Sequence, residues 1–257
     1  MSSAHLDRHA DRSPFAILLF AATIAAAVIP SMLAWNLPPS ATFFNQATAL
    51  IAWGAVAAGI GALAWQTVAS PPRRGLLTWN TGLYSLVAVL GILMLEAACS
   101  SLLGSLPGSL SLSSMGMLAA ALVLVAAGAV ARAQGFGEAV FKAVCIAFVV
   151  AGLMSVVVSC IQLFMPSHTD GVFIARSEPG RAAGNLRQPN HLASFLVWSL
   201  VAAIWLHEVK ALTRAATICV AALFIFTITM SGSRTGALEL VAVTLWGVFD
   251  KRLSRTA

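Results

Sequence analysis

The chain has 257 residues, of which 59% are hydrophobic and only 9% are charged. Soluble domains are about 45–50% apolar and about 25% charged, so this composition excludes a water-soluble globule. It also excludes disorder, because disordered chains combine low hydrophobicity with high charge. The net charge of +6 is spread between apolar blocks in clusters of at most two basic residues, which argues against a nucleic-acid partner. The composition therefore predicts an integral membrane protein.

Eight apolar blocks follow one another along the chain. About 20 apolar residues cross roughly 30 Å of hydrocarbon as a helix, at about 1.5 Å per residue. The last block is the shortest, and the first one is expected to be a retained anchor because no cleavage site follows it. We therefore expect an all-α, polytopic bundle of about eight transmembrane helices. The blocks are 15–35, 47–68, 76–99, 114–131, 139–164, 191–207, 211–230 and 236–249.

The basic residues indicate the orientation, because the cytoplasmic loops of membrane proteins are rich in Lys and Arg. With the amino terminus in the cytoplasm, eleven of the fifteen basic residues lie on the cytoplasmic side, and both termini are expected there. The outer loops 36–46 and 100–113 contain no Lys or Arg. The eleven are Arg8, Arg12, Arg73, Arg74, Arg132, Lys142, Lys210, Arg214, Lys251, Arg252 and Arg255. The four exceptions lie in the two remaining outer segments: Arg176, Arg181, Arg187 and Arg234.

Nothing in the sequence indicates a metal or another cofactor, and none is expected. The four cysteines lie far apart, in or at the end of apolar blocks, and form no CxxC pair, so we interpret them as small buried hydrophobes. Asp170 and Glu178 are the only acidic residues of the outer loops, and their separation argues against a Mg²⁺ site, which prefers clustered oxygen ligands. The cysteines are Cys99, Cys145, Cys160 and Cys219.

The two outer segments that break the charge rule are also the most polar. The first, 165–190, is long for a connection between packed helices, and long loops are often functional. The second, 231–235, reads SGSRT and joins the last two blocks. The polar residues of the first segment are His168, Asp170, Arg176, Glu178, Arg181, Asn185, Arg187, Gln188 and Asn190, followed by His191.

Both segments lead into helices that start at the outer face. Asn190 is expected to cap the sixth helix, and Ser233 or Thr235 the eighth. Helix amino termini attract anions, and arginine binds phosphate in a bidentate way. We therefore expect a site for a phosphorylated or otherwise anionic group at the outer boundary of the membrane. Simple contact with lipid headgroups is the alternative, but it does not explain the accompanying Asn, Gln and His.

Two glutamates lie inside apolar blocks near their outer ends. An intramembrane carboxylate is costly to bury and is a functional candidate by default. For Glu239 we expect a pairing with Arg234 or another outer arginine, which lowers that cost. For Glu96, a role in function and simple extension of the side chain to the water remain open.

Three stretches resemble known sequence motifs. Residues 181–193 read RAAGNLRQPNHLA, and residues 229–236 read TMSGSRTG. Residues 37–45 contain LPP and FFN. Together they resemble the bacterial O-oligosaccharyltransferases, or protein glycosylation ligases, of the O-antigen ligase and polymerase superfamily.

The resemblance implies transfer of a glycan from undecaprenyl pyrophosphate to a Ser or Thr hydroxyl of a protein. The reaction would take place at the periplasmic face of the bacterial inner membrane. The implied partners are a lipid-linked oligosaccharide, an acceptor protein or lipid A–core, and membrane lipids, with no nucleic acid. The implied catalytic residues are His191, Arg181 and Arg234. The implied substrate-binding residues are Arg176, Gly184, Asn185, Arg187, Gln188, Asn190 and Ser233.

The chain departs from the family after the second motif. Family members continue into a large periplasmic loop with a critical histidine and into further spans, whereas this chain stops at residue 257. We therefore expect an incomplete portion of such an enzyme, and whether it is active by itself stays open. It would consist of a cytoplasmic tail (1–14), a five-span bundle (15–164), a periplasmic polar loop (165–190) and the first part of the ligase domain (191–257). The general base is expected outside the chain rather than at His191 or His168.

Three alternatives remain open. The first is an O-antigen ligase or polymerase with a sugar acceptor. The second is a transporter or flippase for an anionic lipid, which would be expected to carry polar residues at the midplane of its helices. The third is a membrane remnant that binds a lipid-linked glycan without turnover.

Overall fold

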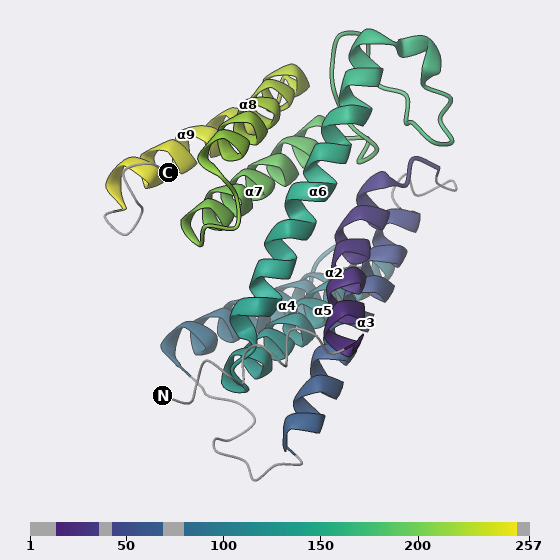
Figure 1. Cartoon of the computed structure of the whole chain (residues 1–257). Helices are drawn as coiled ribbons and strands as arrows, with labels where there is room; N and C mark the ends of the chain where they lie inside the picture. Colours follow the sequence, from purple (N-terminus) through teal and green to yellow (C-terminus); the bar gives the residue numbers. More distant parts are fainter. Residues whose placement is uncertain (1–13, 36–42, 69–79, 251–257) are drawn as a thin grey trace. The chain divides into compact units, whose positions relative to one another are not determined.

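The computed structural model describes residues 14–35, 43–68 and 80–250, and within these ranges the chain is helical, with no strand. This confirms the predicted all-α class (Figure 1). A short 3₁₀ helix, η1 (Pro166–His168), lies in the connection between α6 and α7. The α-helices are α2 (Pro14–Met32), α3 (Phe43–Val68), α4 (Thr81–Leu102), α5 (Gly108–Ala133), α6 (Gly137–Phe164), α7 (Pro189–Glu208), α8 (Arg214–Ser231) and α9 (Arg234–Phe249).

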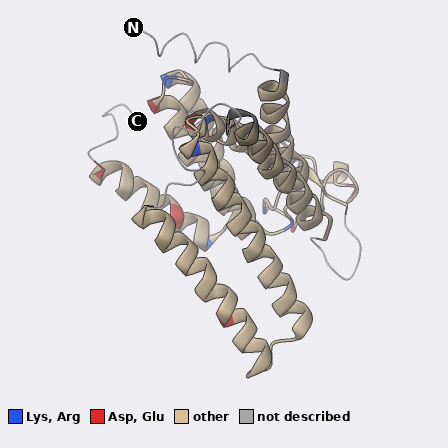
Figure 2. Cartoon of the chain, turned by 90° about the horizontal axis from the view of Figure 1, so that it is seen from below, with Lys and Arg blue, Asp and Glu red and all other residues tan. Residues whose placement is uncertain are grey.

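Each of the eight predicted blocks overlaps one of these helices. Among the described residues, the seven helices α2 to α8 are long and apolar enough to cross a membrane. The last helix, α9, has 16 residues and is about 24 Å long at 1.5 Å per residue. Figure 2 shows how few positions along the described helices carry charged residues. Large apolar side chains such as Ile51, Leu112 and Leu238 are exposed, as expected for helices that face lipid.

The predicted start of the fourth block was wrong. The sequence indicated an outer loop over 100–113, but α5 already begins at Gly108 after an extended Pro107. In the serine-rich start of α5, Ser111 is buried and its hydroxyl group has a partner on α4. The Ser111 hydroxyl donates a hydrogen bond of 2.8 Å to the carbonyl of Ala97 on α4, which joins the two helices where they pack together.

The chain divides into two compact units, each described here by itself. The described part of the first comprises 14–22, 50–68 and 80–141, and that of the second comprises 23–35, 43–49 and 142–250. In the second unit, α7 packs against both α8 and α9. The core between them includes Leu192, Leu196 and Phe224, all fully buried.

Close approach of α7 and α9 depends on a glycine in the first turn of α9. A Cβ atom added at Gly236 would lie 2.5 Å from the Cβ of Ala193 on α7 and 3.1 Å from Cγ2 of Ile228 on α8. Membrane helices pack through small residues in this way, because apolar side chains gain little by leaving lipid. Gly236 therefore fixes how near the two helices come at this end.

We predict that Gly236→Ala lowers the free energy of unfolding by about 1–3 kcal/mol, the usual cost of overpacking. Thermal unfolding in detergent measures the change. Gly247→Ala is the matched control on the same helix, since nothing lies within 4 Å of a Cβ added there. Equal melting temperatures for the two variants would contradict this account of the contact.

Candidate functional site

The site predicted from the sequence lies in the second unit, around the connection between α6 and α7. Apart from η1 this segment has no regular secondary structure, so its backbone polar groups need other partners. Two buried amide side chains supply partners for the buried part of the segment. One is Gln162 in the last turn of α6, and the other is Asn185 within the segment itself.

Gln162 is 4% exposed and makes four hydrogen bonds to the backbone. Its Nε2 donates to the carbonyls of Ala175 (2.7 Å) and Gly184 (3.1 Å). Its Oε1 accepts from the N–H groups of Ala183 (3.1 Å) and Gly184 (2.9 Å). This uses the full capacity of a primary amide. Gln162 therefore holds two distant parts of the segment against the end of α6.

Asn185 is 2% exposed and links the same segment to α2. Its Oδ1 accepts from the N–H of Ala175 (2.9 Å), and its Nδ2 donates to the carbonyls of Met32 (2.7 Å) and Phe173 (2.9 Å). The carbonyl of Met32 belongs to the last turn of α2, where helical partners are missing. The structure thus places the amide of Asn185 among backbone groups of the protein.

The turn over 184–187 needs left-handed backbone at both ends. Gly184 has φ +59°, and Arg187 has φ +60°. Glycine adopts this conformation without strain, whereas at arginine it costs about 1–2 kcal/mol. The Arg187 guanidinium donates a hydrogen bond of 2.6 Å from Nη2 to the carbonyl of Ala34, which offsets part of that cost.

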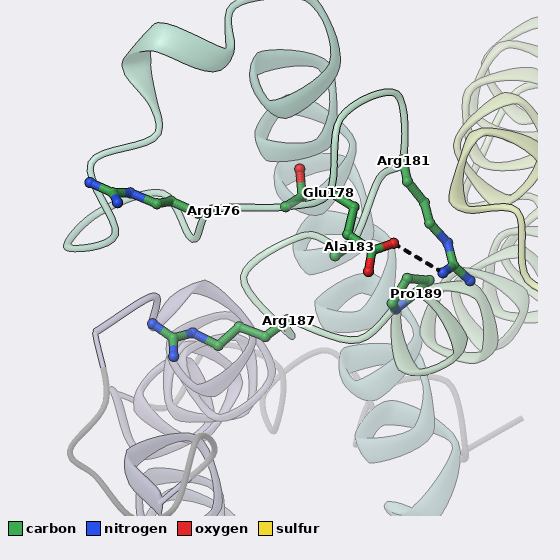
Figure 3. Close-up of a pocket in the computed structure, with 7 residues that line it drawn as sticks. Arg176, Glu178, Arg181, Ala183, Arg187 and Pro189 are labelled. Carbon is green, nitrogen blue, oxygen red and sulfur yellow. Dashed lines mark hydrogen bonds and ion pairs between the residues drawn. The ribbon is translucent and has the colours of Figure 1, made fainter.

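Three of the four outer arginines line one pocket of about 160 Å³. Figure 3 shows the side chains of Arg176 and Arg187 extending to one side and that of Arg181 to the other, where it lies beside the carboxylate of Glu178. Arg234 does not line this pocket. The lining residues are Arg176, Ser177, Glu178, Arg181, Ala183, Arg187 and Pro189.

Arg181 joins the two polar segments that the sequence singled out. Its Nε donates to the carbonyl of Ser231 (2.8 Å), fifty residues along the chain. Its Nη1 lies 3.4 Å from Oε2 of Glu178. Because both side chains of this ion pair are well exposed, it contributes little to stability. The contact with Ser231 and the bond from the Ala182 N–H to the carbonyl of Met230 (3.0 Å) therefore carry the link to the turn between α8 and α9.

The predicted helix cap at Ser233 is confirmed, and the one predicted at Asn190 was wrong. Gly232 ends α8 with φ +62°, and Ser233 caps α9 by accepting from the N–H of Gly236 (3.0 Å). Asn190 does not cap α7, because the helix starts at Pro189 after an extended Gln188. Proline favours the first helical position, where its missing N–H costs nothing. The Asn190 Oδ1 instead accepts a hydrogen bond of 2.8 Å from the Ser233 hydroxyl.

The other proposed site residues lie near this junction or at its edge. Gln188 directly precedes α7 and His191 lies in its first turn, and both are exposed, as is Arg234 at the start of α9. His168 lies in η1, its Nδ1 3.3 Å from the Ser167 hydroxyl oxygen. Within the described ranges, no group of three His, Cys, Asp or Glu residues is placed to hold a metal ion.

The predicted pairing of Glu239 with an outer arginine was wrong. Its Oε1 accepts a hydrogen bond of 2.7 Å from the Ser194 hydroxyl on α7. Its Oε2 is buried without a hydrogen-bond partner. Glu96 is exposed on α4, where its Oε1 accepts a hydrogen bond of 3.2 Å from the Ser100 hydroxyl.

Asp170 orders the exposed tip of the connection between α6 and α7. Its Oδ1 accepts from the N–H groups of Val172 (2.9 Å), Phe173 (2.9 Å) and Ile174 (3.1 Å). These bonds lower the pKa of Asp170 below its usual value of 3.8, and the bond from the Ile174 N–H has the largest effect. Since the bonds favour the carboxylate, they support the turn at higher pH and are lost as the pH falls through the lowered pKa.

We predict that an NMR titration of the Asp170 carboxyl carbon has its midpoint below 3.8. The amide resonances of residues 172–174 should shift with the same midpoint, because they report the loss of their acceptor. Asp170→Asn keeps an acceptor without the charge and should remove the pH dependence of these amides. A midpoint at or above the usual value would contradict the observed geometry.

We also predict that Gln162→Leu loosens the connection between α6 and α7. Buried N–H and C=O groups would lose their partners, which lowers the free energy of unfolding by about 2 kcal/mol or more. Limited proteolysis should then cut within 165–188 faster than in the unaltered chain. Gln188→Leu is the matched control, because Gln188 is exposed. Equal cleavage rates for the two variants would argue against the role of Gln162.

Comparison with known proteins finds similarity in this same region. A family model described as protein glycosylation ligase matches residues 182–207, which run from the pocket through most of α7. A general O-oligosaccharyltransferase of Acinetobacter baylyi (strain ATCC 33305 / BD413 / ADP1) is 38% identical over 84 residues, which is 32% of this chain and 14% of that protein. No solved structure matches. Over this part of its length, the chain is therefore similar to the O-oligosaccharyltransferases, which confirms the resemblance carried by the motifs.

Proposed function

We propose that this chain forms part of a membrane enzyme that transfers a glycan from a lipid pyrophosphate carrier to a protein hydroxyl. The observation that carries the proposal is the position of the matched stretch. Residues 182–207 include Ala183, Arg187 and Pro189, which line the arginine pocket. The segment most similar to glycosylation ligases therefore supplies one wall of the pocket, while Arg176 and Arg181 come from the residues just before it.

The pocket suits a pyrophosphate for electrostatic reasons. Arg176, Arg181 and Arg187 line it with only one acidic residue, Glu178. Guanidinium groups stay charged at every working pH and bind phosphate oxygens through paired N–H groups. Pro189, the first residue of α7, lies at the same pocket, so the partial positive charge of a helix amino terminus adds to that of the arginines.

Transfer breaks the bond between the anomeric carbon and the phosphate oxygen and forms a bond from that carbon to the acceptor oxygen. We propose that Arg181 and Arg234 stabilise the charge that develops on the pyrophosphate leaving group. The exposed side chains of Gln188 and His191 are proposed to contact the donor. For Asn185 we propose a positioning role, because its amide is bonded to backbone groups of the protein.

The acceptor must lose its proton as the new bond forms, and histidine is the usual base for that step. We propose the periplasmic face of a bacterial inner membrane as the place of reaction, with a lipid-linked oligosaccharide as donor and a Ser or Thr of a protein as acceptor. The excess of basic residues at the opposite helix ends supports this orientation.

We predict that Arg181→Ala and Arg234→Ala each weaken binding of undecaprenyl pyrophosphate by about 1.5–3 kcal/mol, the scale of a hydrogen bond to a charged group. Binding is measured with the full chain in lipid nanodiscs. Glu178→Ala should strengthen binding, because it removes the carboxylate that lies 3.4 Å from the Arg181 guanidinium.

Arg214→Ala is the matched control, since Arg214 begins α8 at the end opposite the pocket, and it should leave the affinity unchanged. A circular dichroism spectrum identical to that of the unaltered chain shows that each variant is folded. If both Arg181→Ala and Arg234→Ala bind as tightly as the unaltered chain, the proposed anion site is wrong.

A further inference from the structure

Three polar side chains converge on the end of α2. Asn45 donates from Nδ2 to the carbonyls of Pro30 (2.6 Å) and Leu33 (2.9 Å). Asn185 donates to the carbonyl of Met32, and Arg187 to that of Ala34. The last carbonyls of a helix lack helical partners, so these bonds fix the path of the chain just beyond α2.

The residue that follows this fixed stretch is an aromatic one. Trp35 stacks on Phe44 with ring centroids 5.1 Å apart and an angle of 16° between the planes. Phe43 meets Phe44 edge-on at 5.4 Å. Ala34 is buried at 1% exposure, whereas Trp35 is 52% exposed. An aromatic platform with a half-exposed indole is thus held in a defined position.

This platform is linked to the arginine pocket through Arg187. Arg187 lines the pocket and donates to the carbonyl of Ala34 at 2.6 Å, so the indole belongs to the residue directly after that contact. In a glycan linked to pyrophosphate, the first sugar is bonded directly to a phosphate. The bond between Arg187 and Ala34 is therefore the structural link between the phosphate-binding pocket and Trp35.

We propose that Trp35 is a sugar-binding residue, on whose indole a pyranose ring of the donor packs while the arginine pocket holds the pyrophosphate. The inference rests on the proposed function. Indole is suited to this role because it combines a large apolar surface with one N–H donor. The C–H groups on one face of a pyranose ring pack on such a surface, and the hydroxyl groups at the ring edge stay in water.

A tryptophan near the end of a membrane helix also serves as an anchor in the interface between lipid and water. The two roles differ in what they do to binding. An anchor affects the position of the helix and therefore acts on every ligand alike. A sugar platform acts only on ligands that carry a sugar.

The experiment compares two probes with the full chain in lipid nanodiscs, namely undecaprenyl pyrophosphate and the same lipid carrying one N-acetylglucosamine. Trp35→Ala is expected to weaken binding of the glycosylated probe roughly five- to tenfold, the scale of an aromatic packing contact. It should leave the affinity for the bare probe unchanged. Trp35→Phe should recover part of the loss, because it keeps an aromatic ring.

Trp198→Ala is the matched control, since Trp198 is exposed in the middle of α7, and it should change neither affinity. An equal effect of Trp35→Ala on both probes, or no effect on either, overturns the sugar site and leaves the pyrophosphate site standing. If the unaltered chain binds neither probe, the proposed function fails as well.

Discussion

The site depends on one constraint, which is that an irregular backbone packed against membrane helices must find partners for its N–H and C=O groups. Groups that are buried there are shielded from water, so the protein has to supply their partners. Gln162 meets four such groups with a single side chain, and Asn185 meets three more. These two amides hold residues 173–175 and 183–185 of the connection between α6 and α7 in place, and the arginines lie on either side of these residues.

The fixed path has an electrostatic consequence. Arg181 donates a hydrogen bond to the carbonyl of Ser231, and Arg187 donates one to the carbonyl of Ala34. Their positions are therefore set before any ligand binds. Arginine carries five N–H donors, and each of these two keeps donors beyond the ones it uses within the protein. Their charge is therefore preorganised without being neutralised, and the exposed ion pair of Arg181 with Glu178 is weak enough to yield to a stronger anion.

Hydropathy alone located the helices, because a span is defined by its length and apolar content. Ser233 was also predictable as a cap, since its place after a glycine and before an apolar run is a local signal. Gln162 was not predictable, because a lone glutamine in an apolar block gives no sign of partners 13 to 22 residues away. The prediction that Asn190 caps α7 was wrong for a local reason. The preceding proline takes the first helical position, which makes Gln188 the cap residue.

The position of Glu239 follows from helix geometry. Five residues separate it from Arg234, so the two side chains point about 140° apart on α9 at 3.6 residues per turn. Glu239 faces α7, where Ser194 binds it, next to the close contact of Gly236 with Ala193 and the bridge from Ser233 to Asn190. These contacts form the interface between α7 and α9. Because Glu239 is bonded within this interface, Arg234 stays exposed at the start of α9. Arg234, the arginine of the second motif, thus lies on a side of α9 away from Glu239, which does not neutralise its charge.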